Sequence, residues 1–545
     1  MPRFGQFVLI FIELAFLSAL VLATRCANYQ DVFVDGNVYF VDADCYSRMT
    51  RVRMCEAEPG LIVRHHAFEN FPQGTIPHTT APLDYLILGL SLLLKPFTTE
   101  ALDFAGAFVS PLLALLGSWF LWWWSWRMKF RYRWVMLSLY AISPILVHGT
   151  ELGRPDHQSL SILLVAIAIC AEWSFQEVRA INASSDGIRE SRIALRSRGW
   201  AMISAAAWAL AIWVSAYEPL VLFLIVIVLM LVFGGKNASH NDVATTKCRR
   251  AGWILFAAII AIALLIERRI PSLSIFHSNA IFENWSRTIG ELAHVSPTNA
   301  IWLRWCGYLL LVAPFLIWMS IRAGRDCAPG GRALPISVLL IATYFLTIWQ
   351  ARWAYFFVLI FALALPALLA PIKSPAGVWI AFVLSIFPIL RDWDERLWPN
   401  ETQLAARVER RTESMQLREL TLNLQSCDMH PFLAPWWLSP SIAYWSGQPG
   451  VAGSSHESLN GIEDGARFFL SENLQRAREI LQNHRVAWVY AYDSERVAQN
   501  SAAILDQALP LHPLCRVLDR TPGQAPRSLI FSAQTAAFKL YRVAD

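Results

Sequence analysis

The segment Val41–Arg48 holds two acids, Asp42 and Asp44, directly after the first apolar run of a chain that is poor in charge. Side chains alternate between the two sides of a strand-like or turn segment, so we expect only one acid to face a given ligand. Asp44 is the favoured one, because an Asp-x-Tyr step and a basic run ending at Arg53 follow it. A carboxylate beside cations suits a site that handles a metal ion and a phosphate.

Gly153 and Pro155 predict a tight turn in the polar stretch Glu151–Gln158, which lies between two apolar runs. Such a turn would point short oxygen and nitrogen ligands in one direction, and Asp156 is the carboxylate best placed for this. His157 is either a further metal ligand or a hydrogen-bonded turn histidine. A polar turn at the membrane surface without a ligand is an equally good interpretation of the stretch taken alone.

A third acid, Glu291, stands in a Thr-Ile-Gly-Glu step shortly before the apolar run at Ala300. A single loop glutamate is more often a solvated charge, and acids from separate loops converge only if the spans bring them together. A carboxylate costs about 2.5–3.5 kcal/mol at the bilayer centre and less near its edge. An oxygen-rich cluster of Asp44, Asp156 and Glu291 would suit Mg²⁺ or Mn²⁺.

Arg352 lies in a Gln-Ala-Arg-Trp step between two long apolar runs. A guanidinium at that depth is a natural partner for the phosphate of a lipid. The alternative is an arginine that only extends its charged end to the membrane surface.

Helical membrane spans have to position these loops. Of the 545 residues, 55% are hydrophobic and 16% are charged, which is far more apolar than an average globular protein. A span takes roughly 20 residues, so we predict a polytopic α-helical membrane protein with about 11 transmembrane helices. The predicted spans are Phe7–Thr24, Phe104–Trp126, Trp134–His148, Ser159–Phe175, Gly199–Trp213, Pro219–Phe233, Gly252–Ile266, Ala300–Ile321, Leu334–Trp349, Trp353–Ile372 and Ala376–Leu390.

The apolar run Leu83–Leu94 is too short for a span, because a helix of that length reaches only about 18 Å. Counting it as a span would place the basic loops around Arg131, Arg196 and Arg249 outside. The positive-inside rule therefore puts this run on the outer interface and the N-terminus in the cytoplasm. We expect a bacterial inner (plasma) membrane protein with the organisation 1–391, a multi-span catalytic domain with a large first outer loop (25–103), and 392–545, an extracytoplasmic α/β domain.

The nine cysteines form no C-x-x-C pair, so the sequence suggests neither a zinc ribbon nor a thioredoxin-like site. Disulfides between Cys45 and Cys55, or between Cys427 and Cys515, are both open where the outer face is oxidising. The formal net charge of +5 is small, and we predict no nucleic-acid partner.

Taken together, these loops resemble the catalytic subunit of oligosaccharyltransferase, a glycosyltransferase of the GT-C fold that uses lipid-linked sugars. In that family an Asp-x-Tyr step, a Gly-x-x-Asp turn and a Thr-Ile-x-Glu motif in successive outer loops build the metal site. Here three segments stand in the same order: Asp44-Cys45-Tyr46, Gly153-Arg154-Pro155-Asp156 and Thr288-Ile289-Gly290-Glu291.

The resemblance implies a sugar donor on a polyprenyl phosphate or diphosphate and a divalent metal, Mg²⁺ or Mn²⁺. The metal ligands would be Asp44, Asp156 and Glu291, with His157 as a candidate fourth, and Asp44 would also orient or deprotonate the acceptor. Arg352 occupies a place similar to the family's phosphate-binding arginine. We assign Arg352 and Arg154 to the donor phosphate.

The acceptor side departs from the family pattern. The family reads the Ser or Thr of its acceptor with a Trp-Trp-Asp-Tyr-Gly motif, whereas this chain has Leu438 after Trp436 and Trp437. A buried carboxylate discriminates strongly for a hydroxyl, and a leucine cannot. We therefore predict a protein, lipid or glycan acceptor that is not defined by an Asn-x-Ser/Thr sequon. Trp436 and Trp437 are candidates for acceptor binding, with core packing as the alternative.

A transporter or flippase of a lipid-linked sugar is the alternative function. Transporters tend to place ionisable residues and broken helices at mid-membrane. The informative charges of this chain cluster at the outer ends of the predicted spans, which favours the enzyme.

Overall fold

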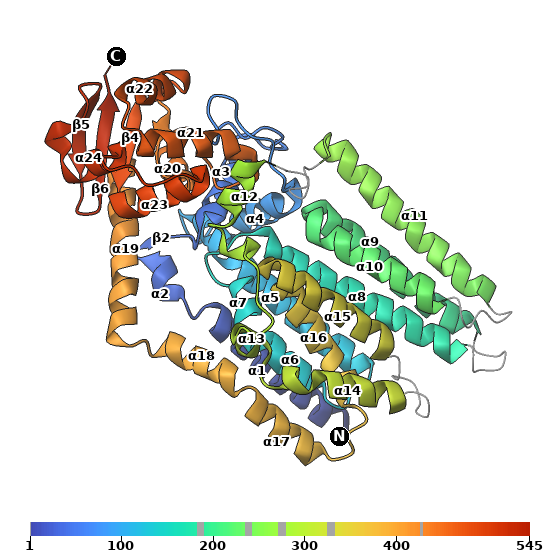
Figure 1. Cartoon of the computed structure of the whole chain (residues 1–545). Coiled ribbons are helices and arrows are strands. Elements are labelled where there is room, and N and C mark those ends of the chain that lie inside the picture. Colours follow the sequence, from blue (N-terminus) through green and yellow to red (C-terminus); the bar gives the residue numbers. More distant parts are fainter. Residues whose placement is uncertain are drawn as a thin grey trace.

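A bundle of long helices makes up most of the protein, and a mixed α/β part follows it at the C-terminus (Figure 1). The structure is a computed structural model that describes residues 2–182, 190–234, 242–270, 279–323, 333–425 and 429–544. Figure 1 shows the N-terminus at the end of the bundle that lies far from the α/β part.

The elements of the first part, in chain order, are α1 (Pro2–Arg25), α2 (Tyr29–Val32), β1 (Phe33–Val34), β2 (Asn37–Val38), α3 (Ala43–Ala57), α4 (Ala81–Leu94), α5 (Ala101–Arg127), α6 (Arg133–Ile142), α7 (Pro144–His148), α8 (His157–Asn182), α9 (Glu190–Val214), α10 (Tyr217–Gly234), α11 (Asp242–Glu267), α12 (Ala280–Ser286), η3 (Gly290–Leu292), α13 (Ile301–Cys306), α14 (Leu309–Ala323), α15 (Ala333–Trp349), η4 (Ala351–Trp353), α16 (Ala354–Leu369), α17 (Pro375–Ser385) and α18 (Phe387–Leu397). β1 and β2 pair as a short antiparallel hairpin.

Within the described residues, five helices are long and apolar enough to cross a membrane, namely Gly5–Arg25, Ala101–Arg127, His157–Glu177, Lys247–Glu267 and Ala351–Leu369. The pair α17 and α18, bent by 42° at their junction, would make a sixth. Five shorter apolar helices accompany them, and α4 is one of these. The predicted count of eleven spans therefore stays a prediction, as does the orientation.

Three of the predicted spans are broken helices in the structure. Proline explains two breaks, because α7 begins at Pro144 and α18 carries Pro388 in its first turn, where no backbone donor is needed. The third break follows α13, which ends at Gly307 with φ 72°, a conformation that favours glycine. The apolar content of the sequence predicts where these helices lie. The breaks within them depend on single proline and glycine residues.

Helix α16 runs through the interior of the bundle, because every residue from Ala354 to Leu369 is buried. Its sequence is apolar on all faces, as expected for a helix that other helices surround. α6, α14 and α15 pack against it. Arg352 lies in η4, directly before this helix. The buried α16 therefore fixes the backbone position from which the Arg352 side chain extends.

The C-terminal part mixes helices with one four-stranded sheet of order β3-β4-β6-β5. β3 and β4 are parallel, while β6 is antiparallel to both β4 and β5. Its elements are α19 (Glu401–Leu422), β3 (Phe432–Leu433), α20 (Ser439–Ser446), η5 (His456–Ser458), α21 (Leu459–Leu470), α22 (Leu474–Asn483), β4 (Trp488–Tyr492), α23 (Ser494–Leu505), α24 (Leu514–Arg520), η6 (Pro522–Gln524), β5 (Leu529–Gln534) and β6 (Phe538–Val543).

The segment between α1 and α5 shares one hydrophobic core with the C-terminal part. α3 packs against α20, where the Tyr46 ring lies edge-on to Trp445 with centroids 5.1 Å apart. The guanidinium of Arg53 sits 3.7 Å from the centroid of the Tyr444 ring, a cation–π contact. Side chains of this segment are therefore held at a fixed place relative to the C-terminal part.

Cys45 and Cys55 are both free, so the disulfide that the sequence left open between them does not form here. Both lie on α3, ten positions apart, and a rise of about 1.5 Å per residue keeps them far beyond bonding distance. Cys515 is also free, while Cys427 lies outside the described residues.

Candidate active site

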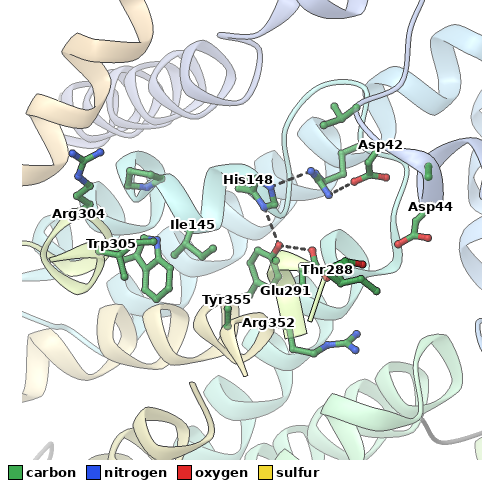
Figure 2. Close-up of a pocket in the computed structure, with 18 of the residues that line it drawn as sticks. Asp42, Asp44, Ile145, His148, Thr288, Glu291, Arg304, Trp305, Arg352 and Tyr355 are labelled. Carbon is green, nitrogen blue, oxygen red and sulfur yellow. Dashed lines mark hydrogen bonds and ion pairs between the residues drawn. The ribbon is translucent and has the colours of Figure 1, made fainter. Parts of the chain in front are cut away.

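A cavity of about 1020 Å³ lies where η3, η4 and the start of α3 meet the C-terminal part. Asp44, Glu291 and Arg352 point into the same part of it, whereas Arg304 and Trp305 lie at its other end (Figure 2). The cavity thus combines a charged region with a wall that is largely apolar.

The expectation of a strand-like segment around Asp44 was wrong, because α3 begins at Ala43. Asp42 is the N-cap of this helix, with extended backbone, and its Oδ1 accepts a hydrogen bond from the Cys45 backbone N–H at 3.0 Å. Asp44 follows in the first helical turn. Both acids line the cavity, and they differ in what they bind: Asp42 caps the helix, and Asp44 is free of that role.

Asp44 is accessible from the cavity, although protein surrounds it on its other sides. This enclosure raises the pKa of its carboxyl well above the usual value, and the negative charges of Asp42, Asp156 and Glu291 add to the shift. The nearby hydroxyl of Ser454 in the C-terminal part acts in the opposite direction. The three predicted acids therefore lie within electrostatic reach of one another, although they come from distant segments.

Asp156 is buried in the loop before α8. Its Oδ1 lies 2.7 Å from Nδ1 of His157 and accepts the His157 backbone N–H at 2.6 Å. Burial alone would raise the pKa of Asp156, but His157 and two buried arginines, Arg48 and Arg154, hold it below its usual range. These neighbours favour the charged form of Asp156, which lies behind the residues that line the cavity.

Glu291 lies in η3 and takes hydrogen bonds from two sides. The Tyr355 hydroxyl donates to its Oε1 at 3.0 Å, and the Gln158 amide approaches Oε2 at 3.5 Å. Burial raises the pKa of Glu291 and nearby Asp156 adds to this, while Arg352 opposes it. Its carboxyl is therefore held in place but lacks a full counter-charge.

Arg352 forms an ion pair with Glu218, which stands at the start of α10. Its guanidinium lies 2.5 Å from Oε1 of Glu218, and 5.5 Å from the ring centroid of Tyr217. Both members of the ion pair are largely buried, with side chains 15% and 5% exposed. Arg352 still lines the cavity, so it can offer its remaining donors to an anion there.

Arg154, which the sequence analysis assigns to the donor phosphate, lines the cavity and also has several partners within the protein. Its guanidinium is bound by Asp42 Oδ2 at 2.6 Å and by Glu151 at 3.3 Å, and it donates to His148 Nε2 at 3.1 Å. These contacts tie the second outer loop to the start of α3. Arg154 therefore positions Asp42 and Glu151. These contacts use most of the N–H groups of its guanidinium.

Two polar residues, His148 and Tyr355, join the site although the sequence analysis did not single them out. Arg154 can only donate, so His148 Nε2 accepts, and its Nδ1–H donates to the Tyr355 oxygen at 2.9 Å. Tyr355 in turn donates to Glu291 (Figure 2). An ionisable histidine at the end of an apolar run was the signal available for finding this chain of hydrogen bonds.

Several solved structures share the overall fold of this chain. The archaeal oligosaccharyltransferase of Archaeoglobus fulgidus, tethered to an acceptor peptide with the NVT sequon, matches with a TM-score of 0.68 at 14% identity, over 98% of this chain and 74% of that one. The same protein in complex with Zn and sulfate matches with a TM-score of 0.67 at 14% identity, over 97% and 73%. ArnT from Cupriavidus metallidurans, bound to undecaprenyl phosphate, matches with a TM-score of 0.55 at 14% identity, over 98% of both chains.

The chain has the GT-C fold. The predicted resemblance is therefore confirmed at the level of the fold, and the long apolar helices support a membrane protein. No model of a protein family matches the sequence, and no curated protein matches it. At 14% identity the substrates have to be argued from the cavity.

The C-terminal part of this GT-C chain contributes Trp436 and Trp437 to the cavity wall. Trp436 donates its indole N–H to Asn500 at 2.9 Å and packs edge-on against Trp285 of α12. Trp437 lies under the guanidinium of Arg496 at 5.4 Å. Both tryptophans are half-buried, so each packs on one side and faces the cavity on the other.

The donor set at the charged end of the cavity fits a divalent cation of the hard, oxygen-preferring kind. Asp44, Asp156 and Glu291 supply carboxylate oxygens, and the pKa values of Asp44 and Glu291 are raised by burial and by neighbouring negative charges. The Gln158 amide oxygen is buried without a hydrogen-bond partner, and so is His157 Nε2. A cation bound between the carboxylates would remove their mutual repulsion and give the orphaned amide oxygen a partner.

Proposed function

We propose that the protein is a metal-assisted glycosyltransferase that moves a sugar or oligosaccharide from a polyprenyl phosphate or diphosphate to an acceptor on the outer face of the membrane. The observation that carries this proposal is that Asp44 and Glu291 line one cavity together with Arg352, while the charge of the buried Asp156 acts on both acids. The GT-C fold supports the reaction class.

Asp44, Asp156 and Glu291 would hold the cation, Mg²⁺ or Mn²⁺. When bound, it would neutralise the charge that develops on the leaving phosphate. The Zn complex of the archaeal oligosaccharyltransferase supports metal binding in this fold. Asp156 is suited to be the permanent anionic ligand because its pKa is lowered.

Asp44 has a second task in this proposal. Its side chain is accessible from the cavity, so its carboxylate can reach an acceptor group that enters there. It would orient the acceptor's nucleophilic group and take up its proton as the bond to the sugar forms. A polyprenyl phosphate leaves as an anion, so a second carboxylic acid, as in glycoside hydrolysis, is not needed.

Arg352 would bind the phosphate of the sugar donor with the guanidinium N–H groups that do not contact Glu218. The lipid chain would lie along the apolar part of the cavity, where Ile145, Ile301 and Trp305 form the wall. Undecaprenyl phosphate bound to ArnT supports a polyprenyl carrier in this fold.

The acceptor would enter from the side of the C-terminal part, along Trp436 and Trp437. Leu438, the residue that would have to recognise a hydroxyl, begins α20 and has no group that can do so. An aromatic wall suits a sugar ring or an apolar acceptor. The acceptor is therefore a lipid, a glycan or a protein site of another definition than the sequon.

The test is to incubate the purified full-length protein with a total extract of its source membranes, which supplies candidate acceptors together with lipid-linked sugars that carry a label in the sugar. We expect release of polyprenyl phosphate or diphosphate that stops with EDTA and returns with Mg²⁺ or Mn²⁺. Equal release by a Glu291→Gln variant, or no consumption of any lipid-linked sugar in the extract, would overturn the proposal.

A flippase would instead move the intact lipid-linked sugar between leaflets. The site residues lie at one end of the bundle, next to the C-terminal part, which supports chemistry at the surface. Proteoliposomes separate the two functions: intact donor that changes leaflet without cleavage would favour the flippase.

A further inference from the structure

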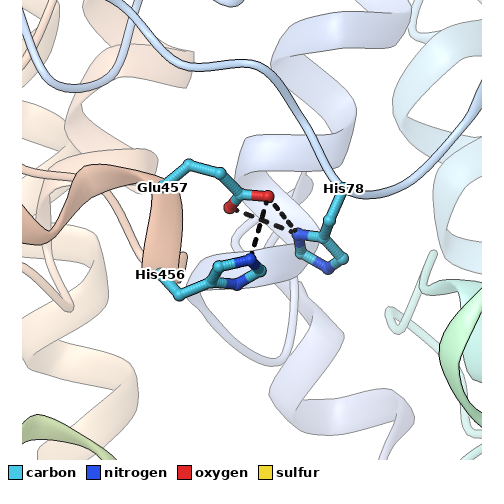
Figure 3. A group of neighbouring side chains, drawn as sticks. All are labelled: His78, His456 and Glu457. Carbon is cyan, nitrogen blue, oxygen red and sulfur yellow. Dashed lines mark hydrogen bonds and ion pairs between the residues drawn. The ribbon is translucent and has the colours of Figure 1, made fainter. Parts of the chain in front are cut away.

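A second group of metal-ligating side chains lies outside the carboxylate site. His78 is in the loop before α4, whereas His456 and Glu457 are in η5 of the C-terminal part. Figure 3 shows the carboxylate of Glu457 between the two imidazole rings. The three side chains therefore join two segments whose members His78 and Glu457 are 379 positions apart in the sequence.

The distances within this group are short enough for the three side chains to share one metal ion. Nδ1 of His78 lies 3.0 Å from Oε1 of Glu457, and Nε2 of His456 lies 3.4 Å from the same oxygen. One ligand atom of each residue lies within 4.8 Å of the others. Ligand atoms around a tetrahedral Zn²⁺ are roughly 3.3 Å apart, given bonds of about 2.0–2.1 Å.

The surroundings suit three protein ligands and one open position. The side chains of His456 and Glu457 are 9% exposed, whereas that of His78 is 34% exposed, so the group is enclosed on one side and reachable from the other. Zn²⁺ sites with three protein ligands keep their fourth position for a water or a substrate atom.

A buried histidine nitrogen without a hydrogen-bond partner lies beside the group and also supports a bound metal ion. Nε2 of His157 is buried without a hydrogen-bond partner, in a residue that is only 6% exposed. The His157 ring lies edge-on to that of His78, with centroids 6.2 Å apart. A metal-bound water would give this nitrogen the partner that the protein does not.

The ligand chemistry separates this group from the carboxylate site. Two imidazoles and one carboxylate favour Zn²⁺ or another late first-row metal, while the oxygen cluster around Asp44 favours Mg²⁺ or Mn²⁺. We propose that His78, His456 and Glu457 bind a Zn²⁺ ion that joins the first outer loop to the C-terminal part. This inference is independent of sugar transfer, because the ligands and their test do not involve the donor.

The alternative is a metal-free group in which Glu457 accepts hydrogen bonds from both imidazoles. Metal binding distinguishes the two, since Zn²⁺ must displace the protons that these bonds require. The experiment uses full-length protein in detergent, with any affinity tag removed, stripped with EDTA and then titrated with Co²⁺. Tetrahedral Co²⁺ absorbs visible light far more strongly than octahedral Co²⁺, so the spectrum reports the site without any activity assay.

We expect one equivalent of tetrahedral Co²⁺, displaced by Zn²⁺ and not by excess Mg²⁺. Glu457→Gln, which keeps the side-chain volume, should weaken Zn²⁺ binding by more than about 100-fold, beyond the 10–100-fold loss typical of an outer hydrogen-bonding partner. His78→Ala, at the most exposed ligand, should do the same. His512→Ala is the matched control, because it removes an exposed imidazole from the same part of the chain.

Wild-type protein without a tetrahedral Co²⁺ spectrum would overturn the proposal without any variant. Glu457→Gln or His78→Ala protein that binds Co²⁺ as tightly as wild type would also overturn it. Asp44→Asn should leave the visible spectrum unchanged, and loss of the spectrum in that variant would mean that the Co²⁺ had bound at the carboxylates instead.

Discussion

The carboxylate site and the histidine group differ in how far the negative charge of their acids is compensated by neighbouring residues. Asp44, Asp156 and Glu291 repel one another, and this repulsion contributes to the raised pKa of Asp44 and Glu291. In the histidine group, Glu457 already lies within hydrogen-bond distance of His78. A cation at the carboxylates therefore relieves an existing conflict, whereas Zn²⁺ at the histidines has to replace bonds that are already satisfactory. Uncompensated negative charge in a cavity is therefore stronger evidence for a bound cation than a set of ligands that already hydrogen-bond to one another.

The largest expected effect comes from removing one carboxylate. Glu291→Gln keeps the size and the hydrogen-bond reach of the side chain but removes its charge, so sugar transfer should fall by more than about 100-fold, beyond the loss seen when an outer partner of a metal site is removed. Glu283→Gln in α12 is the matched control, because Glu283 is exposed and lies outside the cavity. Similar activity in the two variants would contradict the assignment of Glu291.

Arg352 provides a test of how charge is compensated next to the carboxylates. Arg352→Ala would leave Glu218 buried without its partner, which should lower the free energy of unfolding by about 3–5 kcal/mol. Adding Glu218→Gln should restore most of the stability but not donor binding, because the guanidinium for the phosphate is still missing. Thermal unfolding in detergent and binding of undecaprenyl phosphate measure the two effects separately. Full recovery of binding in the double variant would exclude a phosphate contact by Arg352.

The pH dependence of metal binding should follow the raised pKa values of Asp44 and Glu291. A carboxyl whose pKa is raised in the folded protein favours folding at low pH, so metal-free protein should lose stability as pH rises from about 4 through the raised values. Metal binds the deprotonated acids, so the gain in melting temperature from Mn²⁺ should be largest near neutral pH and shrink on acidification. Asp156 stays charged throughout, because its pKa is lowered.

Melting curves with and without Mn²⁺ across this range check the prediction. Glu291→Gln removes one of the two raised groups and should flatten the curve. A gain from Mn²⁺ that is the same at every pH would show that neither carboxyl titrates on metal binding.

The smallest expected effect concerns the acceptor. Paired peptides that differ only in the hydroxyl of an Asn-x-Ser/Thr site should be glycosylated equally or not at all, because Leu438 cannot accept a hydrogen bond. Transfer to the Ser/Thr peptide and not to its Ala twin would show that another residue reads the hydroxyl.

Sequence reasoning went far for the helices and only part of the way for the site. Apolar length located every predicted span on a helix, yet it could not see the breaks at Pro144 and Gly307, which depend on single backbone positions. The ordered motifs pointed to Asp44, Asp156 and Glu291, whose proximity depends on the fold.

The contacts between distant segments had no signal in the sequence. His78 and Glu457 meet only because α3 and the loop after it pack against the C-terminal part, and no spacing rule links residues so far apart. Arg154 was assigned to a phosphate because of its charge, whereas its partners Asp42 and Glu151 use that charge within the protein.

The central claim is that Asp44, Asp156 and Glu291 together hold one divalent cation in the cavity. Electron paramagnetic resonance of Mn²⁺ added to the full-length, EDTA-stripped protein measures this most directly, because bound and free Mn²⁺ give different signals. The account predicts one tightly bound Mn²⁺ in wild type and in Glu457→Gln, and none in Asp156→Asn. Tight Mn²⁺ binding that survives Asp156→Asn, or that disappears with Glu457→Gln, would contradict it.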